Sequence, residues 1–242
     1  MRTVVITGSS RGIGLAAARR FAREGCNIVL NSSRGGAQLD GALAAVLAAG
    51  ASAIAVAADV SRYSECERLM SETAKHFGAA DVLVNNAGRS CVCLFTDMRP
   101  DEISAAVDAN LTCAMYASHV CIPGMVKRKS GVIVNVSSMW GGAGASCEAV
   151  YSAAKGGLNV FTKALAKELG PSGVRVNAVS CGVIATGMNA FLSPGEAAAL
   201  ADQIPLTRFG TAEEAAEAIF FLASDSASYI TGQILGVDGG FI

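Results

Sequence analysis

Short runs of β-branched and aliphatic residues alternate along the chain with longer stretches in which apolar residues recur every three or four positions. The short runs predict strands, and the longer stretches predict helices. The expected strands cover residues 3–7, 27–31, 52–57, 81–85, 131–137, 174–180 and 233–237. The expected helices cover residues 12–24, 36–49, 64–77, 101–128, 151–169 and 211–223.

Continuous apolar strands separated by helices indicate a parallel sheet that is buried on both faces. Right-handed crossovers then predict an α/β fold, a doubly wound (Rossmann) sheet of seven parallel strands with helices on both faces. No Pro/Gly-rich linker or internal repeat divides the sequence, so we expect residues 1–242 to form a single domain. Residues 187–210 fit neither period and predict a long loop on the substrate side.

The composition excludes several classes of function. Apolar residues make up 52% of the chain, charged residues make up 16%, and the formal net charge is −1. Lysine and arginine are dispersed, so we expect no nucleic-acid partner. The uncharged run at 41–58 is long enough to resemble a membrane span, but it is mostly alanine and Gly50 divides it. We therefore expect no membrane association.

The cysteines and the first residues of the chain bear on its location. Eight cysteines occur, but their positions give neither a disulfide framework nor zinc-ligand spacing, and there are only two histidines. We therefore expect reduced thiols and no metal site. At most four apolar residues precede Gly8, so no signal peptide is expected. These features predict a cytoplasmic protein.

The segment TGSSRGIG at residues 7–14 joins the first expected strand to the first expected helix. Gly8, Gly12 and Gly14 permit a tight turn and the close approach of a pyrophosphate, which the N–H groups of the helix N-terminus would bind. The spacing is G-x-x-x-G-x-G, and glycine-rich turns also occur in methyltransferases or as plain turns. By itself the segment indicates a nucleotide site only weakly.

Tyr151 and Lys155 stand four residues apart on an expected helix, so the phenol and the ammonium share one face. A nearby ammonium stabilises the phenolate form of a tyrosine and so lowers the pKa of the phenol from its ordinary value of about 10. The pair therefore fits an acid–base tyrosine. Taken alone, however, a Y-x-x-x-K pair is more often an ordinary surface pair.

Taken together, the motifs resemble those of the short-chain dehydrogenase/reductase family over nearly the whole chain. The match comprises T-G-x-x-x-G-I-G at 7–14, N-N-A-G at 85–88, a serine thirteen residues before Y-x-x-x-K, and V-D-G-G at 237–240. Chance agreement in both residue type and order is negligible. The resemblance implies an enzyme that moves a hydride between a nicotinamide cofactor and a carbonyl carbon.

The resemblance assigns catalytic roles to four residues. It implies that Tyr151 donates the proton and that Ser138 holds the substrate oxygen. It further implies that Lys155 lowers the pKa of Tyr151 and binds the nicotinamide ribose, and that Asn110 helps a water relay reach Lys155. A hydroxyl donor of suitable pKa contributes about 10²–10⁴-fold to the rate.

The resemblance also implies a set of cofactor-binding residues. Asp59 matches a position at the adenine ring, and Ile184 and Thr186 match positions at the nicotinamide carboxamide. The full set is Gly8, Ser10, Arg11, Gly12, Ile13, Gly14, Ser32, Arg34, Asp59, Val60, Asn86, Ala87, Gly88, Tyr151, Lys155, Gly182, Ile184 and Thr186.

The residue that closes the second strand indicates which nucleotide binds. An acidic side chain there would pair with a free ribose 2′-hydroxyl and repel a 2′-phosphate. Here that position is Ser32, and Arg11 and Arg34 carry guanidinium groups that suit phosphate oxygens. We therefore expect NADP(H) to be preferred, with NAD(H) as the alternative cofactor.

Two segments depart from the pattern of most relatives. Cys181 precedes Gly182 where most relatives have proline, which loosens the loop beside the nicotinamide. Before Tyr151, the segment CEAV lacks the amide-rich pattern of many acyl-carrier-protein reductases. Glu148 would place a carboxylate near the substrate mouth, and Trp140 offers an apolar wall. These departures leave the substrate less well defined than the reaction.

We expect an NADPH-dependent oxidoreductase that reduces a ketone to a secondary alcohol, similar to 3-oxoacyl-acyl-carrier-protein reductases. One alternative changes only the substrate, because GASCEAVYSAAKGG also resembles clostridial-type reductases of an aminopentanone carried by elongation factor P. Sugar, polyol and steroid alcohols are further alternatives. A nucleotide sensor without turnover belongs to a different class, and the presence of both Tyr151 and Ser138 argues against it.

The expected partner is a small-molecule or carrier-bound carbonyl substrate. Related enzymes pair the helices that correspond to 101–128 and 151–169 between subunits and make a second contact through the C-terminal segment 233–242, and here these helices carry apolar residues beyond one face. The resemblance therefore implies a homotetramer with two-fold axes.

Overall fold

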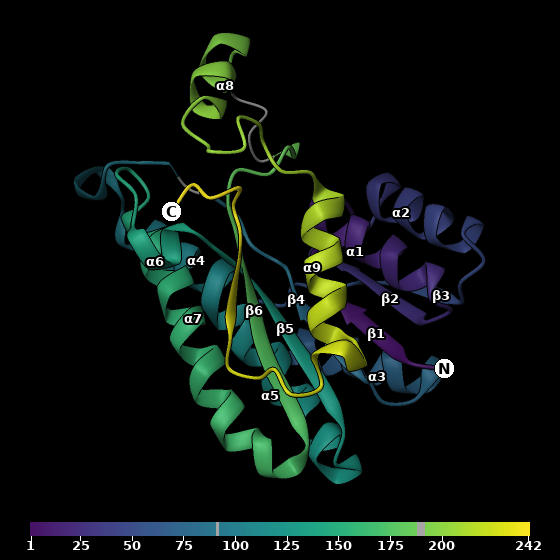
Figure 1. The fold of residues 1–242 in the computed structure, drawn as a ribbon. Coiled ribbons are helices and arrows are strands. Elements are labelled where there is room, and N and C mark those ends of the chain that lie inside the picture. The colour runs from purple at the N-terminus through teal and green to yellow at the C-terminus, as the bar shows by residue number, and fades with distance from the viewer. Residues whose placement is uncertain (91, 188–191) are drawn as a thin grey trace.

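The computed structural model describes residues 1–90, 92–187 and 192–242. Within them, seven strands join one parallel sheet in the order β3-β2-β1-β4-β5-β6-β7 (Figure 1). The strands are β1 Thr3–Ile6, β2 Asn27–Ser32, β3 Ala53–Ala57, β4 Val82–Asn85, β5 Gly131–Ser138, β6 Val174–Cys181 and β7 Ile234–Val237. The predicted doubly wound sheet is confirmed, and every strand ends within one residue of its predicted range.

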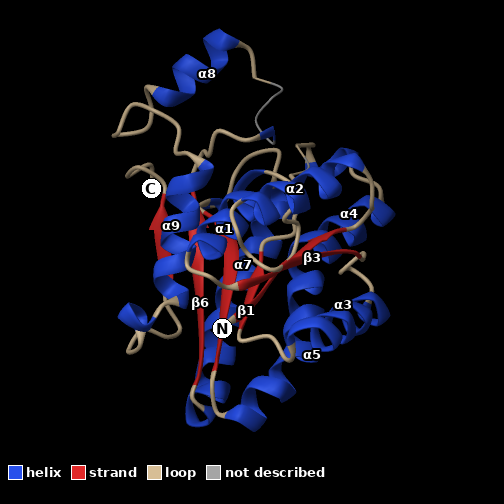
Figure 2. Ribbon diagram, turned by 90° about the vertical axis from the view of Figure 1, so that its right-hand side faces the viewer, coloured by secondary structure: helices blue, strands red, loops and turns tan. Residues whose placement is uncertain are grey.

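Helices cover both faces of the sheet (Figures 1 and 2). One layer consists of α1 Gly12–Arg23, α2 Ala37–Ala48 and α9 Ala212–Ala223. The other consists of α3 Tyr63–Phe77, α5 Cys113–Arg128 and α7 Ala149–Leu169. Alternate side chains of each strand enter opposite cores, so Val4 and Ile6 face the first layer and Val5 faces the second. None of the helices in the described part of the chain combines the length and apolarity that a membrane crossing requires.

A chain of polar side chains crosses the otherwise apolar interior beside β4 and β5. Asn85 Nδ2 donates to Asn135 Oδ1 at 2.9 Å, and Asn135 Nδ2 donates to Thr162 Oγ1 at 2.8 Å. All three residues are buried. Because a buried polar group without a partner costs stability, these bonds fix α7, which carries Thr162, relative to the central strands.

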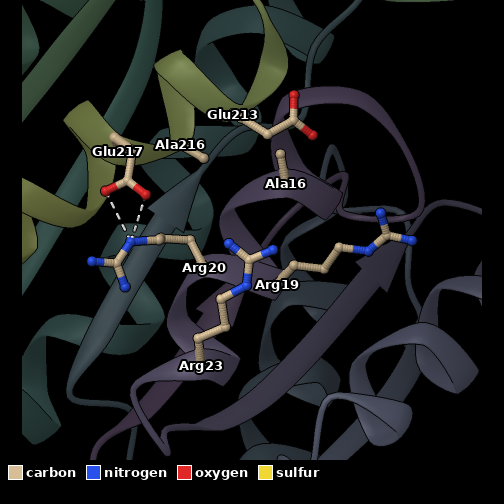
Figure 3. Close-up of a pocket in the computed structure, with 7 residues that line it drawn as sticks. All are labelled: Ala16, Arg19, Arg20, Arg23, Glu213, Ala216 and Glu217. Carbon is tan, nitrogen blue, oxygen red and sulfur yellow. Dashed lines mark hydrogen bonds and ion pairs between the residues drawn. The ribbon is translucent and has the colours of Figure 1, made fainter.

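An ion pair of Arg20 joins α1 to α9, although the two helices lie far apart in sequence. Arg20 contacts Glu217 at 2.7 Å and Glu24 at 2.6 Å, and its guanidinium lies 3.7 Å from the ring centre of Phe220. Figure 3 shows Arg20 turned toward Glu217, whereas Arg19 extends in the opposite direction. Because β7 follows α9, this contact holds the C-terminal part of the chain against the first βα unit.

The helix predicted over residues 101–128 is divided into three segments. Helices α4 Pro100–Val107 and α5 flank a π-helical turn, Asp108–Thr112. Asn110 lies in this turn, and its Nδ2 donates to Ala106 O at 2.9 Å. Such turns occur frequently at functional sites, but an amphipathic period does not reveal them.

A further helix, α8 Pro194–Ala201, lies in the segment predicted as a loop at 187–210. It begins with a capping box in which Ser193 Oγ accepts from Glu196 N at 3.3 Å and Glu196 Oε2 accepts from Ser193 N at 2.9 Å. No residue of α8 is buried, so its sequence lacks the period that would predict a helix. Figures 1 and 2 show α8 standing away from the sheet. Residues 188–191 of the predicted loop lie outside the described residues.

Candidate active site

The loops that follow β1, β4, β5 and β6 all leave the same edge of the sheet, because the strands are parallel. Strands β1 and β4 are neighbours, but β1 leads to α1 in one helical layer and β4 leads toward α5 in the other. Ligands of open α/β sheets bind at such a change of direction, outside the carboxyl ends of the strands. The predicted site residues follow these strands.

The turn after β1 and the turn after β4 are locked together by hydrogen bonds. Asn86 Nδ2 donates to Thr7 O and to Gly8 O, both at 2.9 Å. Thr7 Oγ1 accepts from the backbone N–H groups of Asn86 and Ala87, both at 3.0 Å. A Cβ on Gly14 would lie 2.5 Å from Asn86 Nδ2, so the close approach requires glycine there. The predicted residues Asn86 and Ala87 therefore shape the glycine-rich turn directly.

Asn31 also supports this turn, and the sequence prediction missed it. Its Oδ1 accepts from Gly8 N at 3.3 Å, while its Nδ2 donates to Val56 O at 3.1 Å and to Ala58 O at 2.9 Å. The side chain thus ties together the ends of β1, β2 and β3. The available signal was a polar residue inside an apolar strand, because a buried amide requires partners.

The N-terminus of α1 has the features of an anion-binding site. Gly8 and Gly12 adopt positive φ values of 63° and 55°, which bring the backbone into the turn. The N-cap residue Arg11 makes no side-chain capping hydrogen bond, and the first turn contains no acidic residue. The first-turn N–H groups therefore suit a pyrophosphate. The predicted residues in this segment are Gly8, Ser10, Arg11, Gly12, Ile13 and Gly14.

The residues predicted at the adenosine end lie after β2 and β3. Ser32 is the last residue of β2, and its Oγ donates to the backbone oxygen of Arg34. The side chain of Arg34 is exposed. Asp59 Oδ1 accepts from Ser61 Oγ at 2.7 Å, which holds the turn after β3, and Val60 beside it is buried. No carboxylate stands at the end of β2 itself.

The loop after β6 approaches the same edge. A Cβ on Gly12 would lie 3.6 Å from Thr186 Cγ2, so Thr186 adjoins the start of α1. Ile184 is buried and forms a parallel bridge with Gly210. Gly182 packs so closely that an added Cβ would lie 2.6 Å from the Cα of Asp238. Of the predicted residues of this loop, Thr186 thus lies beside the glycine-rich turn, whereas Ile184 and Gly182 pack against Gly210 and Asp238.

The four predicted catalytic residues are all buried near one another. Their exposed fractions are 1% for Asn110, 7% for Ser138, 8% for Tyr151 and 4% for Lys155. The Ser138 hydroxyl lies close enough to Tyr151 to lower the pKa of its phenol, and Lys155 Nζ donates to Val136 O at 2.9 Å. Strand β5 supplies Ser138 and helix α7 supplies Tyr151 and Lys155.

Gly88 connects this group to the turn after β4. A Cβ on Gly88 would lie 2.8 Å from Asn110 Oδ1 and 3.4 Å from Lys155 Nζ. Asn110 Oδ1 accepts from Arg89 N at 3.1 Å, and its Nδ2 donates to Arg89 O at 2.9 Å. The Asn110 side chain therefore pairs with the backbone N–H and C=O of Arg89 as a neighbouring strand would. In this way the π-helical turn holds the turn after β4 in place.

A sequence profile of the family described as enoyl-(acyl carrier protein) reductase matches residues 8–242. The chain is 42% identical to a 3-oxoacyl-[acyl-carrier-protein] reductase of Synechocystis, and the match covers 100% of this chain and 97% of that protein. The fold matches the crystal structure of a 3-oxoacyl-[acyl-carrier protein] reductase from Brucella melitensis with a TM-score of 0.94, at 35% identity, covering 100% of this chain and 91% of that one.

The chain belongs to the short-chain dehydrogenase/reductase family. It is therefore an oxidoreductase of a class that uses nicotinamide cofactors, and the resemblance seen in its motifs is confirmed. An uncharacterized oxidoreductase of Bacillus subtilis, YmfI, is also similar: it is 40% identical, over 99% of this chain and 98% of that protein.

Burial governs the acid–base state of Tyr151 in this dehydrogenase/reductase. The pKa of Tyr151 is raised to about 12: burial raises it most, the Ser138 hydroxyl lowers it, and the charge of Glu148 raises it. The Lys155 ammonium binds Val136 O and lies 5.8 Å from the Tyr151 ring centre. Burial also lowers the pKa of Lys155 itself. The phenol is therefore protonated at neutral pH.

Glu148 lies beside the substrate side of this site, immediately before α7. Its Oε1 accepts from Ser90 Oγ at 2.5 Å, and Ser90 follows Gly88 in the turn after β4. The two loops also pair through their backbones, since Cys93 N donates to Cys147 O at 2.7 Å. The carboxylate is thus fastened, half-buried, between two loops instead of projecting into solvent.

Cys181, the residue found where relatives carry proline, is a packing residue. It is 6% exposed, and burial raises the pKa of its thiol to about 12. Its backbone oxygen accepts from Met139 N at 2.9 Å, which joins the end of β6 to the segment after β5. A thiol in this state is protonated and unreactive at neutral pH.

Replacing Glu148 by glutamine tests the electrostatic coupling between Glu148 and Tyr151. The Glu148→Gln change keeps the shape and removes the charge, so we expect the pKa of Tyr151 to fall. Ultraviolet difference titration of the phenolate, with the Tyr151→Phe variant subtracted, measures this shift. Glu168→Gln, at the other end of α7, is the control and should leave the titration unchanged. A Tyr151 titration in Glu148→Gln at the wild-type pH or above would contradict the coupling.

Proposed function

We propose that this protein reduces a ketone to a secondary alcohol with NADPH as the reductant, and that its substrate is a 3-oxoacyl group on acyl carrier protein. The observation that carries the proposal is the buried group of Ser138, Tyr151, Lys155 and Asn110, next to the glycine-rich turn. The relatives named 3-oxoacyl-[acyl-carrier-protein] reductase, similar over the whole chain, support the substrate class.

In the proposed reaction the hydroxyl groups of Ser138 and Tyr151 bind the carbonyl oxygen. The two hydroxyl groups lie close together, so a carbonyl oxygen placed beside them can accept a hydrogen bond from each. The nicotinamide cofactor, when bound, supplies the hydride to the carbonyl carbon. Tyr151 Oη then gives its proton to the alkoxide, and its raised pKa keeps that proton in place until the oxygen becomes basic.

Lys155 is suited to hold the ribose of the cofactor. Within the described residues its ammonium donates to Val136 O, and an ammonium has three N–H donors. The two other N–H groups of the ammonium can therefore donate to acceptors such as the hydroxyl groups of a ribose. Gly88 and Asn110 border the ammonium, so a sugar would enter between the turn after β4 and the start of α7.

The names of the relatives favour reduction of a ketone over reduction of a carbon–carbon double bond. Both a 3-oxoacyl and an enoyl thioester offer a carbonyl oxygen to the hydroxyl groups of Ser138 and Tyr151, so these hydroxyl groups do not separate the two substrates. The relatives that are similar over the whole chain are named 3-oxoacyl-[acyl-carrier-protein] reductases, and we therefore assign reduction of the ketone to this chain, although the matching family profile is described by its enoyl reductases.

The preference for NADPH rests on the end of β2. Ser32 leaves room for a 2′-phosphate where a carboxylate would repel it, and the exposed guanidinium of Arg34 follows directly. Arg11 supplies a second guanidinium from the glycine-rich turn. A phosphate between two guanidinium groups gains charge-assisted hydrogen bonds.

A second substrate class is favoured by one observation, the half-buried carboxylate of Glu148. Held by Ser90 and close enough to raise the pKa of Tyr151, it would attract an ammonium or another hydrogen-bond donor on the substrate. An aminopentanone carried by elongation factor P has such a group. Parallel kinetics with an acetoacetyl thioester and an amino-ketone distinguish the two classes, because only the amino-ketone should lose rate in Glu148→Gln.

We propose that the chain assembles as a homotetramer through α5 and α7. An apolar groove of about 480 Å³ lies between these helices and α3. It is lined by Tyr63, Met115, Tyr116, His119, Ile122, Phe161, Leu165 and Glu168. Val160, in the middle of α7, is 67% exposed, so it places a large apolar side chain at the surface. A two-fold axis through the groove would cover both copies of it and pair two chains, and a second two-fold contact at the C-terminal segment 233–242 would join two such pairs into the tetramer.

The organisation of the chain supports two further parts of the proposal. All seven described strands join one sheet, which supports a single dinucleotide-binding domain over residues 1–242. The buried, unbridged thiols of Cys26, Cys66 and Cys113 suit the reducing cytoplasm.

The proton donor is tested by Tyr151→Phe, which removes one hydroxyl and keeps the ring. We expect NADPH binding to persist and turnover of an acetoacetyl thioester to fall by about 10²-fold or more. Tyr229→Phe removes the hydroxyl of a fully exposed tyrosine and is the matched control. NADPH oxidation is followed with the acetoacetyl thioester and, in parallel, with a crotonyl thioester. Near-wild-type turnover in Tyr151→Phe would refute the mechanism, and faster reduction of the crotonyl thioester by the wild type would refute the ketone substrate.

The nucleotide preference is tested by Ser32→Asp, which adds a carboxylate at the end of β2. We expect the Kd for NADPH to rise and the Kd for NADH to fall, since the new charge repels a 2′-phosphate and pairs with a 2′-hydroxyl. Isothermal titration calorimetry measures both constants. Ser52→Asp makes the same change at an exposed serine before β3 and controls for net charge. Tighter binding of NADH than of NADPH to the unmodified protein would overturn the preference.

The assembly is tested by light scattering at micromolar protein concentration. We expect the mass of four chains, and we expect Val160→Asp to lower it, because the charge would lie on the exposed apolar face of α7. Val126→Asp, an exposed position on α5 outside the groove lining, is the control. A stable wild-type monomer under these conditions would exclude the tetramer.

A further inference from the structure

An aromatic pair, Trp140 and Phe241, adjoins the residue proposed to hold the substrate oxygen. Trp140 begins the short helix α6 Trp140–Ala143, and its backbone N–H donates to Ser138 Oγ at 3.2 Å. The Trp140 ring meets the ring of Phe241 edge to face, with 6.0 Å between centroids and 82° between planes. Both side chains remain partly exposed. An accessible apolar surface therefore begins two residues from Ser138.

The chain end that carries Phe241 is held in place by hydrogen bonds. Gly240 N donates to Asp238 Oδ1 at 2.9 Å, and Gly239 O accepts from Leu206 N at 3.2 Å. Gly239 and Gly240 adopt positive φ values of 68° and 84°, which turn the chain back across the sheet edge. Figure 1 shows the C-terminus lying beside α6, under the segment that returns from α8. The position of Phe241 thus follows from the fold of the last five residues.

We propose that Trp140 and Phe241 form the wall that receives the alkyl chain of the substrate, so that the C-terminal segment sets the preferred chain length. The inference rests on the proposed function, because it requires a ketone whose oxygen lies at Ser138. Glu148 and Ser90, which also border the site, are polar and bonded to each other, so an alkyl chain gains more from contact with the aromatic pair. Aromatic rings offer a large apolar area with few rotatable bonds to fix.

The kinetic test compares a short and a long 3-oxoacyl thioester, acetoacetyl and 3-oxooctanoyl. In Phe241→Ala we expect the ratio of kcat/KM for the long to the short substrate to fall about 5- to 50-fold, mainly through KM, since the lost contact is to a non-reacting group. Phe241→Leu should restore most of the ratio. Ile242→Ala, at the exposed neighbouring residue, is the matched control and should keep the wild-type ratio. An unchanged ratio in Phe241→Ala would overturn the wall.

A binding measurement separates this inference from the proposed function. Trp140 is the only tryptophan of the chain, so intrinsic fluorescence reports on the wall itself. With NADP⁺ present, straight-chain methyl ketones of increasing length should change this fluorescence with decreasing Kd, and Phe241→Ala should abolish the dependence on length. If no thioester is reduced but this dependence is observed, the proposed substrate is wrong and the wall stands. If the fluorescence does not respond, or Phe241→Ala responds like the wild type, the wall is refuted even in an active enzyme.

Discussion

The hydrogen bonds between the turn after β1 and the turn after β4 are the constraint on which both halves of the candidate site depend. Asn86 donates to Thr7 O and Gly8 O, and its side chain occupies the space in which Gly14 would carry a Cβ. Two residues later, Gly88 lies against Lys155 and against Asn110, which belongs to the π-helical turn. One short turn therefore shapes the N-terminus of α1 and positions the residues that we propose to transfer the proton. Because each of these hydrogen bonds has a backbone oxygen next to the end of β1 as its acceptor, the distance between the two halves depends on the pairing of β1 with β4 in the sheet.

The buried polar groups of the site are satisfied mainly by backbone partners, and this determines the chemistry of Tyr151. Lys155 binds Val136 O and Asn110 binds the backbone of Arg89, so neither group is left unpaired in the protein interior. The acidity of Tyr151 is then governed by burial, by Ser138 and by the charge of Glu148. A phenol that retains its proton suits reduction, in which Tyr151 gives the proton away.

The parts of the chain with a regular period were predictable, and the exceptions have physical causes. Strand β5 is buried along its whole length, so its continuous apolar run identifies it. Helix α8 buries no residue and the π-helical turn interrupts a helix without changing its composition, so neither leaves a periodic signal. The spacing of Tyr151 and Lys155 predicts a shared helical face, but it does not reveal that the ammonium turns to a backbone oxygen of β5. The roles of Asn110 and Ser138 came from the family motif and not from their local sequence.

The substrate side is built from segments that can change without disturbing the catalytic hydroxyls. Its polar wall comes from the turn after β4 and the start of α7, and its aromatic wall comes from α6 and the chain end. The backbone N–H of Trp140 donates to Ser138 Oγ, so the side chain of Trp140 takes no part in holding Ser138 and can contribute to substrate specificity. A substrate with an apolar chain at one end and a hydrogen-bond donor at the other would fit both walls. Both an acyl chain on an amide-containing carrier arm and an amino-ketone have this pattern, so both substrate classes fit the residues of the mouth. The two classes share one reaction, which we propose takes place at the hydroxyl groups of Ser138 and Tyr151.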